Sequence, residues 1–141
     1  MRRDTVHSFH HSLVAIPILS VSLLIAAQSA PTPRRGGNPD AAKIQSPVPY
    51  SPESVSAGRR PYTQLCANCH GPTGRGDGTS AGADQPSDLT DAAWDFGSTD
   101  GDLYAVIRFG ITGKDMGGYA ERLSETDMWN VVNYVRSLAK K

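Results

Sequence analysis

The sequence predicts an all-α domain in residues 52–141 of the 141-residue chain. Three stretches in this part carry helix-capping residues or apolar residues at the spacing of an amphipathic helix. No segment alternates between apolar and polar residues in the way that a half-buried strand does. Residues 71–96 are rich in Gly, Asp and Pro and show neither pattern. The fold class is therefore helical, with one long irregular segment.

Residues 1–30 have the layout of a secretory signal peptide. Arg2 and Arg3 precede an almost continuous apolar run at 13–27, and Ala27 and Ser29 are the small residues of a cleavage site. The run is 15 residues long and contains Pro17, whereas a transmembrane helix needs roughly 18 apolar residues. A cleaved leader is thus favoured, and we expect membrane anchoring only if the leader stays uncleaved.

Residues 31–51 are predicted to form a disordered, Pro-rich linker. The segment has hardly any large apolar residue, and it contains five prolines: Pro31, Pro33, Pro39, Pro47 and Pro49. Such a composition cannot bury enough surface to offset the entropy lost on ordering. The folded domain is therefore expected to start near residue 52.

The first helix is expected to begin after Ser51, which suits the N-cap. Pro52 suits the first helical position and Glu53 places a negative charge in the first turn. Pro61 lacks a backbone donor and clashes with the preceding turn. We therefore expect a kink or a restart of the helix near Arg60.

Residues 66–70 (CANCH) contain both cysteines of the chain. Two thiols separated by two residues, with a histidine directly after the second, form the motif of covalent haem attachment. Each sulfur of Cys66 and Cys69 would add to one vinyl group of the porphyrin, and His70 would reach the iron from the proximal side. One haem c is therefore predicted, and attachment of this kind is expected outside the cytoplasm, in a bacterial periplasm.

Three other interpretations of this motif are weaker. The spacing is tight for a structural disulfide, and no strand pattern precedes Cys66 as it would in a thioredoxin-like dithiol. A structural zinc site needs four ligands, yet the remaining histidines, His7, His10 and His11, all lie in the leader. Haem attachment is therefore favoured.

Two further helices are predicted. One covers residues 100–109, with Ser98 or Thr99 as its cap and Gly110 as its end. The other follows the N-cap Ser124, with Leu123 and Met128 as its hydrophobic staple. Its apolar stripe is Met128, Val131, Val132, Val135 and Leu138. The domain has few large apolar residues for its length, which is consistent with a haem at its centre.

The sixth iron ligand distinguishes electron transfer from catalysis. His70 is the only histidine outside the leader, so ligation by two histidines of the mature chain is excluded. The soft candidates are Met116 and Met128, with Lys114 as an outside possibility. Met128 is expected in the core, whereas Met116 lies in a glycine-bounded loop 46 residues beyond His70. A thioether opposite an imidazole favours Fe(II) and fills the last coordination position, so electron transfer is predicted.

Over roughly residues 55–138 the chain resembles the small monohaem class I cytochromes c of bacteria, close to the haem domains of terminal-oxidase subunits. The shared pieces are Gly58 and Tyr62 before CANCH, then GPTGRGDG, PSDLT, the GITGKDM loop and the final LSETDMWNVVNYVRSL. The resemblance implies a small helical cytochrome c-like domain, at residues 52–141, wrapped around one covalently attached haem.

The resemblance also implies roles for single residues. Cys66 and Cys69 would carry the thioethers, and His70 and Met116 would be the axial ligands. Gly58 would let the first helix cross the last beside Tyr134. The backbone carbonyl of Pro86 would orient the proximal imidazole, a role that suits the tuning of a metal ligand.

Charge limits the class of partner. The whole chain has 14 basic and 14 acidic residues, which excludes a strongly basic nucleic-acid binder. From Glu53 onward there are nine basic and twelve acidic residues, a net charge of −3. The acidic residues between 76 and 107 are interpreted as solvated loops and helix caps, the alternative being an acidic face that steers a basic partner.

The predicted function is that of a periplasmic electron carrier, not an enzyme, with redox proteins as donor and acceptor and no small-molecule substrate. The main alternative is a haem subunit of a larger dehydrogenase or terminal oxidase, tethered by the Pro-rich segment. A haem-based ligand sensor or peroxidase is a third possibility, and it would need an open or labile sixth position.

Overall fold

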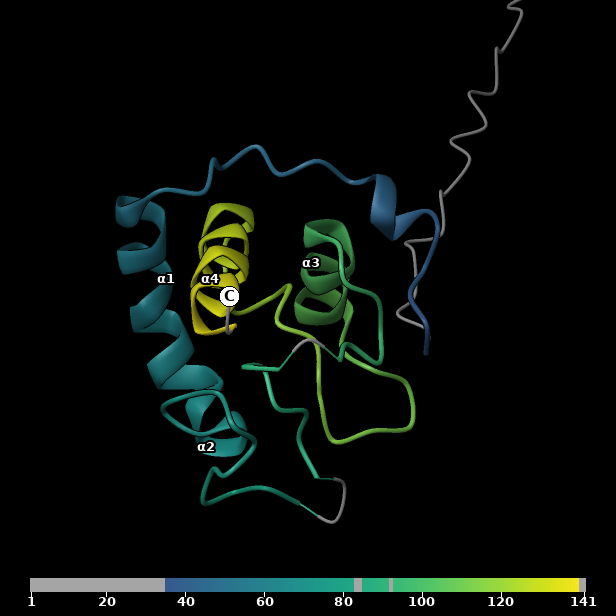
Figure 1. Ribbon diagram of the computed structural model, residues 1–141, viewed down its shortest axis with the longest axis vertical. Coiled ribbons are helices and arrows are strands. Elements are labelled where there is room, and N and C mark those ends of the chain that lie inside the picture. The colour runs from purple at the N-terminus through teal and green to yellow at the C-terminus, as the bar shows by residue number, and fades with distance from the viewer. Residues whose placement is uncertain (1–34, 83–84, 92, 140–141) are drawn as a thin grey trace, which may run out of the picture.

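The structure is a computed structural model that describes residues 35–82, 85–91 and 93–139. This part of the chain holds four α-helices and one 3-10 helix (Figure 1), and no strand beyond an isolated bridge between Gly110 and Gly117. The all-α prediction is confirmed. The signal peptide predicted at residues 1–30 lies outside the described residues. Within them, no helix combines the length and the apolar character needed to cross a membrane.

Helix α1 (Pro52–Leu65) begins as predicted, because the Ser51 hydroxyl accepts a hydrogen bond from the backbone of Ser54 at 3.2 Å. Of the two alternatives expected near Arg60, a kink or a restart, the restart is wrong, since the helix continues through Pro61. Pro61 leaves the carbonyl of Ala57 without its usual helical donor. Ala57 is exposed, so water can satisfy that carbonyl and the helix does not have to break.

Helix α4 (Glu125–Leu138) crosses α1 at very short range. A Cβ atom on Gly58 would lie 1.9 Å from the backbone oxygen of Asn130, so only a glycine allows this approach. The rings of Tyr62 and Tyr134 pack beside the crossing with their centroids 4.9 Å apart. The predicted apolar stripe on α4 is confirmed, because Met128, Val131, Val132 and Val135 are buried and Leu138 is partly buried against them.

Helix α3 (Asp100–Phe109) lies against α4 (Figure 1). Thr99 is its cap, and Thr99 and Asp102 form a reciprocal capping box. Tyr104 stacks on Trp129 of α4, with ring centroids 4.1 Å apart and the planes 5° from parallel. Gly110 ends the helix at a φ of 71°, a conformation that favours glycine.

Residues 35–51 differ from the predicted disordered linker, because the structure packs them against the helices. Residues Ala41–Lys43 form the 3-10 helix η1, which contacts α3, and Ala41 is fully buried. At the other end of the segment, the side-chain amide of Asn133 donates to the carbonyl of Pro49 at 3.2 Å. These partners on α3 and α4 offset the ordering entropy, and prolines reduce that entropy by restricting the unfolded chain. Composition alone does not reveal such partners.

Candidate cofactor site

The two cysteines are held at the junction of α1 and a four-residue helix, α2 (Ala67–His70). Cys66 ends α1 through its backbone N–H, which donates to the carbonyl of Tyr62 at 2.8 Å. Cys66 is buried, Cys69 is exposed, and both are free thiols. Burial raises the pKa of the Cys66 thiol to about 11. The structure therefore presents two reduced thiols one helical turn apart and does not pair them with each other.

The imidazole of His70 is held by a backbone carbonyl. Its Nδ1 lies 3.2 Å from the carbonyl oxygen of Ser87, which can only accept, so Nδ1 carries the proton and the lone pair of Nε2 is left for a metal ion. Burial lowers the pKa of His70, although the hydrogen bond to Ser87 opposes this effect. A neutral imidazole is the form that binds a metal.

The carbonyl that contacts His70 belongs to Ser87, one residue after the predicted Pro86. The resemblance implied that the carbonyl of Pro86 orients His70, whereas the nearby acceptor is the carbonyl of Ser87. The carbonyl of Pro86 faces Gly76 instead, where a Cβ atom would lie 2.4 Å from it. Successive carbonyls in an extended segment point in different directions, so a shift of one residue changes which of them meets the ring. Pro86 itself lines the same cavity as His70.

A cavity of about 320 Å³, partly open to solvent, brings the predicted site residues together. Cys66, Cys69, His70, Pro86 and Met116 all line it, although His70 and Met116 are 46 residues apart in the sequence. Most of the other lining is apolar or aromatic: Tyr62, Leu65, Leu89, Trp94, Phe96, Leu103, Val106, Ile107, Ile111, Tyr119, Val131 and Val135. The described residues contain no cluster of three or more His, Cys, Asp or Glu side chains that could hold a metal ion by themselves.

Met116 sits in a loop whose backbone is pinned at both ends. The N–H of Ile111 donates to the carbonyl of Met116 at 2.8 Å, and the N–H of Tyr119 donates to the carbonyl of Ile107 at 2.9 Å. Gly110 is required here, because a Cβ atom on it would lie 2.6 Å from the oxygen of Met116. The second candidate, Met128, is fully buried in the core and does not line the cavity, whereas Lys114 does line it.

Ser87 and Tyr119 also line the cavity, and neither was predicted from the sequence. The hydroxyl of Tyr119 donates to the carbonyl of Leu65 at 3.1 Å, which ties the methionine loop to the end of α1. Burial raises the pKa of this hydroxyl, so it stays protonated and able to donate. The group of Ser87 that meets His70 is its backbone carbonyl, which every residue has. No feature of the sequence could therefore have identified Ser87.

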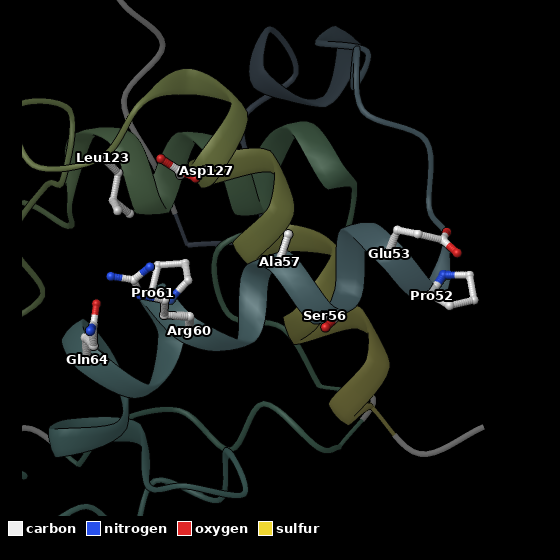
Figure 2. A pocket seen from close by; sticks show the side chains of 9 residues that line it. All are labelled: Pro52, Glu53, Ser56, Ala57, Arg60, Pro61, Gln64, Leu123 and Asp127. Carbon is white, nitrogen blue, oxygen red and sulfur yellow. The ribbon is translucent and has the colours of Figure 1, made fainter.

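A larger hollow of about 970 Å³ lies along α1, and its lining contains neither cysteine. Figure 2 shows the side chains that line it, spread along α1 from Pro52 to Gln64, with Leu123 from the turn before α4 and Asp127 from the first turn of α4. Its lining combines two carboxylates, one guanidinium and small residues, and it includes neither of the thiols nor His70. Size alone would favour this hollow, but it carries none of the predicted site residues.

The smaller cavity fits a haem by the chemistry of its lining. It offers two reduced thiols at the attachment spacing, an imidazole with a free Nε2, and a thioether from a separate loop. Its remaining walls are largely apolar, as the faces of a porphyrin require. These are the groups that covalent haem attachment and axial ligation use.

Comparisons with known proteins agree with this chemistry. The family model described as Cytochrome c matches residues 55–139. Among solved structures, a chain of the reducing HAO-like protein complex Kustc0457/Kustc0458 of Kuenenia stuttgartiensis is 30% identical, with a TM-score of 0.64. That match covers 70% of this chain but only 49% of the other, so this chain spans about half the length of that relative.

Two solved cytochromes show the same fold at lower identity. Cytochrome cL from Hyphomicrobium denitrificans is 21% identical, with a TM-score of 0.54 over 79% of this chain and 76% of that one. Cytochrome CL from Methylophaga aminisulfidivorans MPT is 20% identical, with a TM-score of 0.53 over 74% of this chain and 60% of that one. At these identities the likeness concerns the fold alone.

Proposed function

Since the chain belongs to the cytochrome c family, we propose that it carries electrons with His70 and Met116 as the axial ligands of its haem iron. As a class I c-type cytochrome the protein has a covalently attached haem c, and its chemistry is haem-based electron transfer. Cys66 and Cys69 are the proposed attachment points, because they are the two thiols of the motif and both line the cavity.

The observation that supports this ligation is that His70 and Met116 line the same cavity. The haem supplies a one-electron Fe(III)/Fe(II) couple. Ser87 holds the imidazole in the tautomer that leaves Nε2 available, and the pinned backbone around Gly110 holds the methionine loop over the cavity. With the imidazole of His70 and the thioether of Met116 as its two axial ligands, the iron would have no coordination site left for a substrate. The proposed role is therefore that of a carrier rather than an enzyme.

A redox-titrated optical spectrum of the purified mature protein tests this ligation. We expect low-spin spectra in both oxidation states, a methionine–ferric charge-transfer absorption and a single reversible one-electron couple. Carbon monoxide binding to the ferrous protein at neutral pH would contradict the proposal. It would indicate an open sixth position and favour a ligand sensor or a peroxidase-like haem protein.

A second candidate function is that of a haem subunit in a larger oxidoreductase. The likeness to a chain of the HAO-like protein complex of Kuenenia stuttgartiensis supports it. The proposal predicts that the cytochrome co-purifies with a larger enzyme in a fixed ratio that survives high salt. A free carrier would instead elute alone at the size of one chain.

We further propose that the protein works in the periplasm, on the basis of the signal-peptide pattern in residues 1–30. Fractionation of cells that produce the full-length chain tests this proposal. We expect the haem-stained band in the periplasmic fraction, with an N-terminus near residue 30. A band confined to the membrane fraction with residues 1–30 retained would mean that the leader acts as an anchor.

A further inference from the structure

The segment before α1 forms part of the cavity wall, although residues 35–54 precede the region that matches the cytochrome c family. The N–H of Gly36 donates to the carbonyl of Asp95 at 2.5 Å, and the N–H of Asn38 donates to the buried carboxylate of Asp102 at 3.1 Å. A Cβ atom on Gly37 would lie 3.0 Å from Cα of Gly97. The start of the segment is thus bonded to the 94–97 loop and to the first turn of α3.

This contact places Arg35 in the lining of the cavity, together with the four residues of the 94–97 loop. In Figure 1 the start of the segment lies beyond α3, on the opposite side of the molecule from α1 and α2. The cysteines of the attachment motif are at the α1–α2 junction. Arg35 and the 94–97 loop therefore belong to the wall that is remote from the thiols.

The chemistry of haem c indicates which groups of the cofactor would meet this remote wall. The two vinyl-bearing pyrroles and the two propionate-bearing pyrroles lie at opposite edges of the porphyrin. Attachment at Cys66 and Cys69 would therefore turn the propionate edge toward the wall that contains Arg35. Two carboxylates entering a largely apolar cavity need cations or hydrogen-bond donors.

Among the charged groups that line the cavity, Arg35 is the cation best placed to meet a propionate. The cationic residues of the lining are Arg35 and Lys114, and its carboxylates are Asp95 and Asp115. Lys114 belongs to the methionine loop, directly before Asp115. Arg35 stands in the remote wall, where the carboxylate of Asp95 adds negative charge and increases the need for a cation. A guanidinium also matches a carboxylate in a two-point hydrogen-bonded geometry that an ammonium cannot form.

We propose that Arg35 is a haem-binding residue that pairs with a haem propionate, so that the N-terminal segment completes the cofactor site. The inference rests on the proposed function only through haem attachment at Cys66 and Cys69. A guanidinium beside a propionate offsets its negative charge, and this favours the Fe(II) state, which has one positive charge fewer than Fe(III). Loss of the guanidinium therefore lowers the reduction potential.

The test compares Arg35→Gln with Arg59→Gln in the full-length holoprotein. Arg59 is exposed on α1 and lines neither hollow, so it controls for the same change in net charge. We expect Arg35→Gln to lower the equilibrium constant for reduction several-fold, up to about tenfold, where a tenfold change corresponds to about 59 mV for one electron. Arg35→Lys should recover part of the loss. A shift no larger than that of Arg59→Gln would overturn the proposal.

A second readout separates pairing from a general effect of charge. The propionate bending mode in the resonance Raman spectrum reports hydrogen bonding to that group, and it should shift in Arg35→Gln and stay unchanged in Arg59→Gln. An unchanged mode in both variants would count against the pairing. The optical spectrum of each variant reports axial ligation independently, so a failure of the proposed His70–Met116 ligation would be visible without affecting this comparison.

Discussion

At the scale of single residues, the site depends on which backbone groups hold the side chains of the proposed ligands. His70 is oriented by the carbonyl of Ser87. The Met116 loop is closed by a hydrogen bond that the N–H of Ile111 donates to the carbonyl of Met116. The sequence was sufficient to identify His70, the one histidine after residue 30, as a candidate ligand, and to separate Met116 in a loop from Met128 on an apolar stripe. It was not sufficient to name Ser87, because a carbonyl is present at every position.

Replacing Met116 with alanine should remove the proposed thioether ligand and leave the fold intact. We expect loss of the methionine–ferric charge-transfer band and a fall in reduction potential on the order of 0.1–0.3 V, within the roughly 0.8 V range that axial ligands span. Met128→Leu is the matched control, since Met128 is 1% exposed in the core. It should keep the band and change the free energy of unfolding by less than about 1.5 kcal/mol. The opposite assignment would follow if Met128→Leu lost the band and Met116→Ala retained it.

At the scale of elements, the crossing of α1 and α4 sets the frame into which the attachment motif fits. The α1 backbone approaches α4 at Gly58, four residues before Tyr62 and eight before Cys66. Helical periodicity and capping predicted α1, α3 and α4, because both signals are local. The continuity of α1 through Pro61 could not be predicted in this way, since it depends on whether the freed carbonyl of Ala57 faces solvent.

Gly58→Ala should force the two helices apart, because the new Cβ would lie 1.9 Å from the oxygen of Asn130. We expect a loss of about 3 kcal/mol in the free energy of unfolding, at the upper end of overpacking effects. Gly117→Ala is the control, because nothing lies within 4 Å of its Cβ position. It should be neutral or stabilising by up to about 1 kcal/mol. Urea unfolding followed by circular dichroism measures both, and equal effects would argue against the close crossing.

Asp102 joins the N-terminal segment to α3, so its loss should loosen that contact. Its buried carboxylate accepts hydrogen bonds from the backbone of Asn38 and from both the backbone and the hydroxyl of Thr99. We expect Asp102→Ala to cost about 3 kcal/mol and to speed proteolysis of residues 35–51. Asp100→Ala removes the same charge from a partly exposed ion pair with Arg136, and it should cost about 1 kcal/mol or less. Similar losses in the two variants would mean that the segment is not held through Asp102.

At the scale of the whole molecule, the core contains a cavity of about 320 Å³. An unfilled cavity costs about 24 cal/mol per Å³, so a void of this size would cost on the order of 8 kcal/mol. Domains of this kind have a total stability of only about 5–15 kcal/mol. Because the cavity is partly open to solvent, about 8 kcal/mol is the upper bound of this cost. Even so, a cost of this order means that the haem is a main part of the core.

The double variant Cys66→Ala, Cys69→Ala should therefore fail to form a rigid fold. Without covalent attachment we expect some helix in the far-ultraviolet circular dichroism, loss of the near-ultraviolet signal and binding of hydrophobic dyes. The exposed double variant Ser56→Ala, Thr63→Ala retains the haem and should unfold cooperatively. A cooperative thermal transition in the haem-free double-cysteine variant would show that the protein side chains alone sustain the core.

By itself the sequence determined the helical class, the attachment of haem at CANCH and the ligand candidates, because spacing along one helix and the chemistry of side chains are local properties. Tertiary structure decided which of those candidates share a cavity, which carbonyl meets His70 and whether residues 35–51 are ordered. Composition predicted disorder for that segment, since few of its residues can bury apolar surface. The buried contacts that Ala41 and Asn38 make with α3 reversed that prediction, because the energy of such contacts depends on partners that lie more than fifty residues away in the chain.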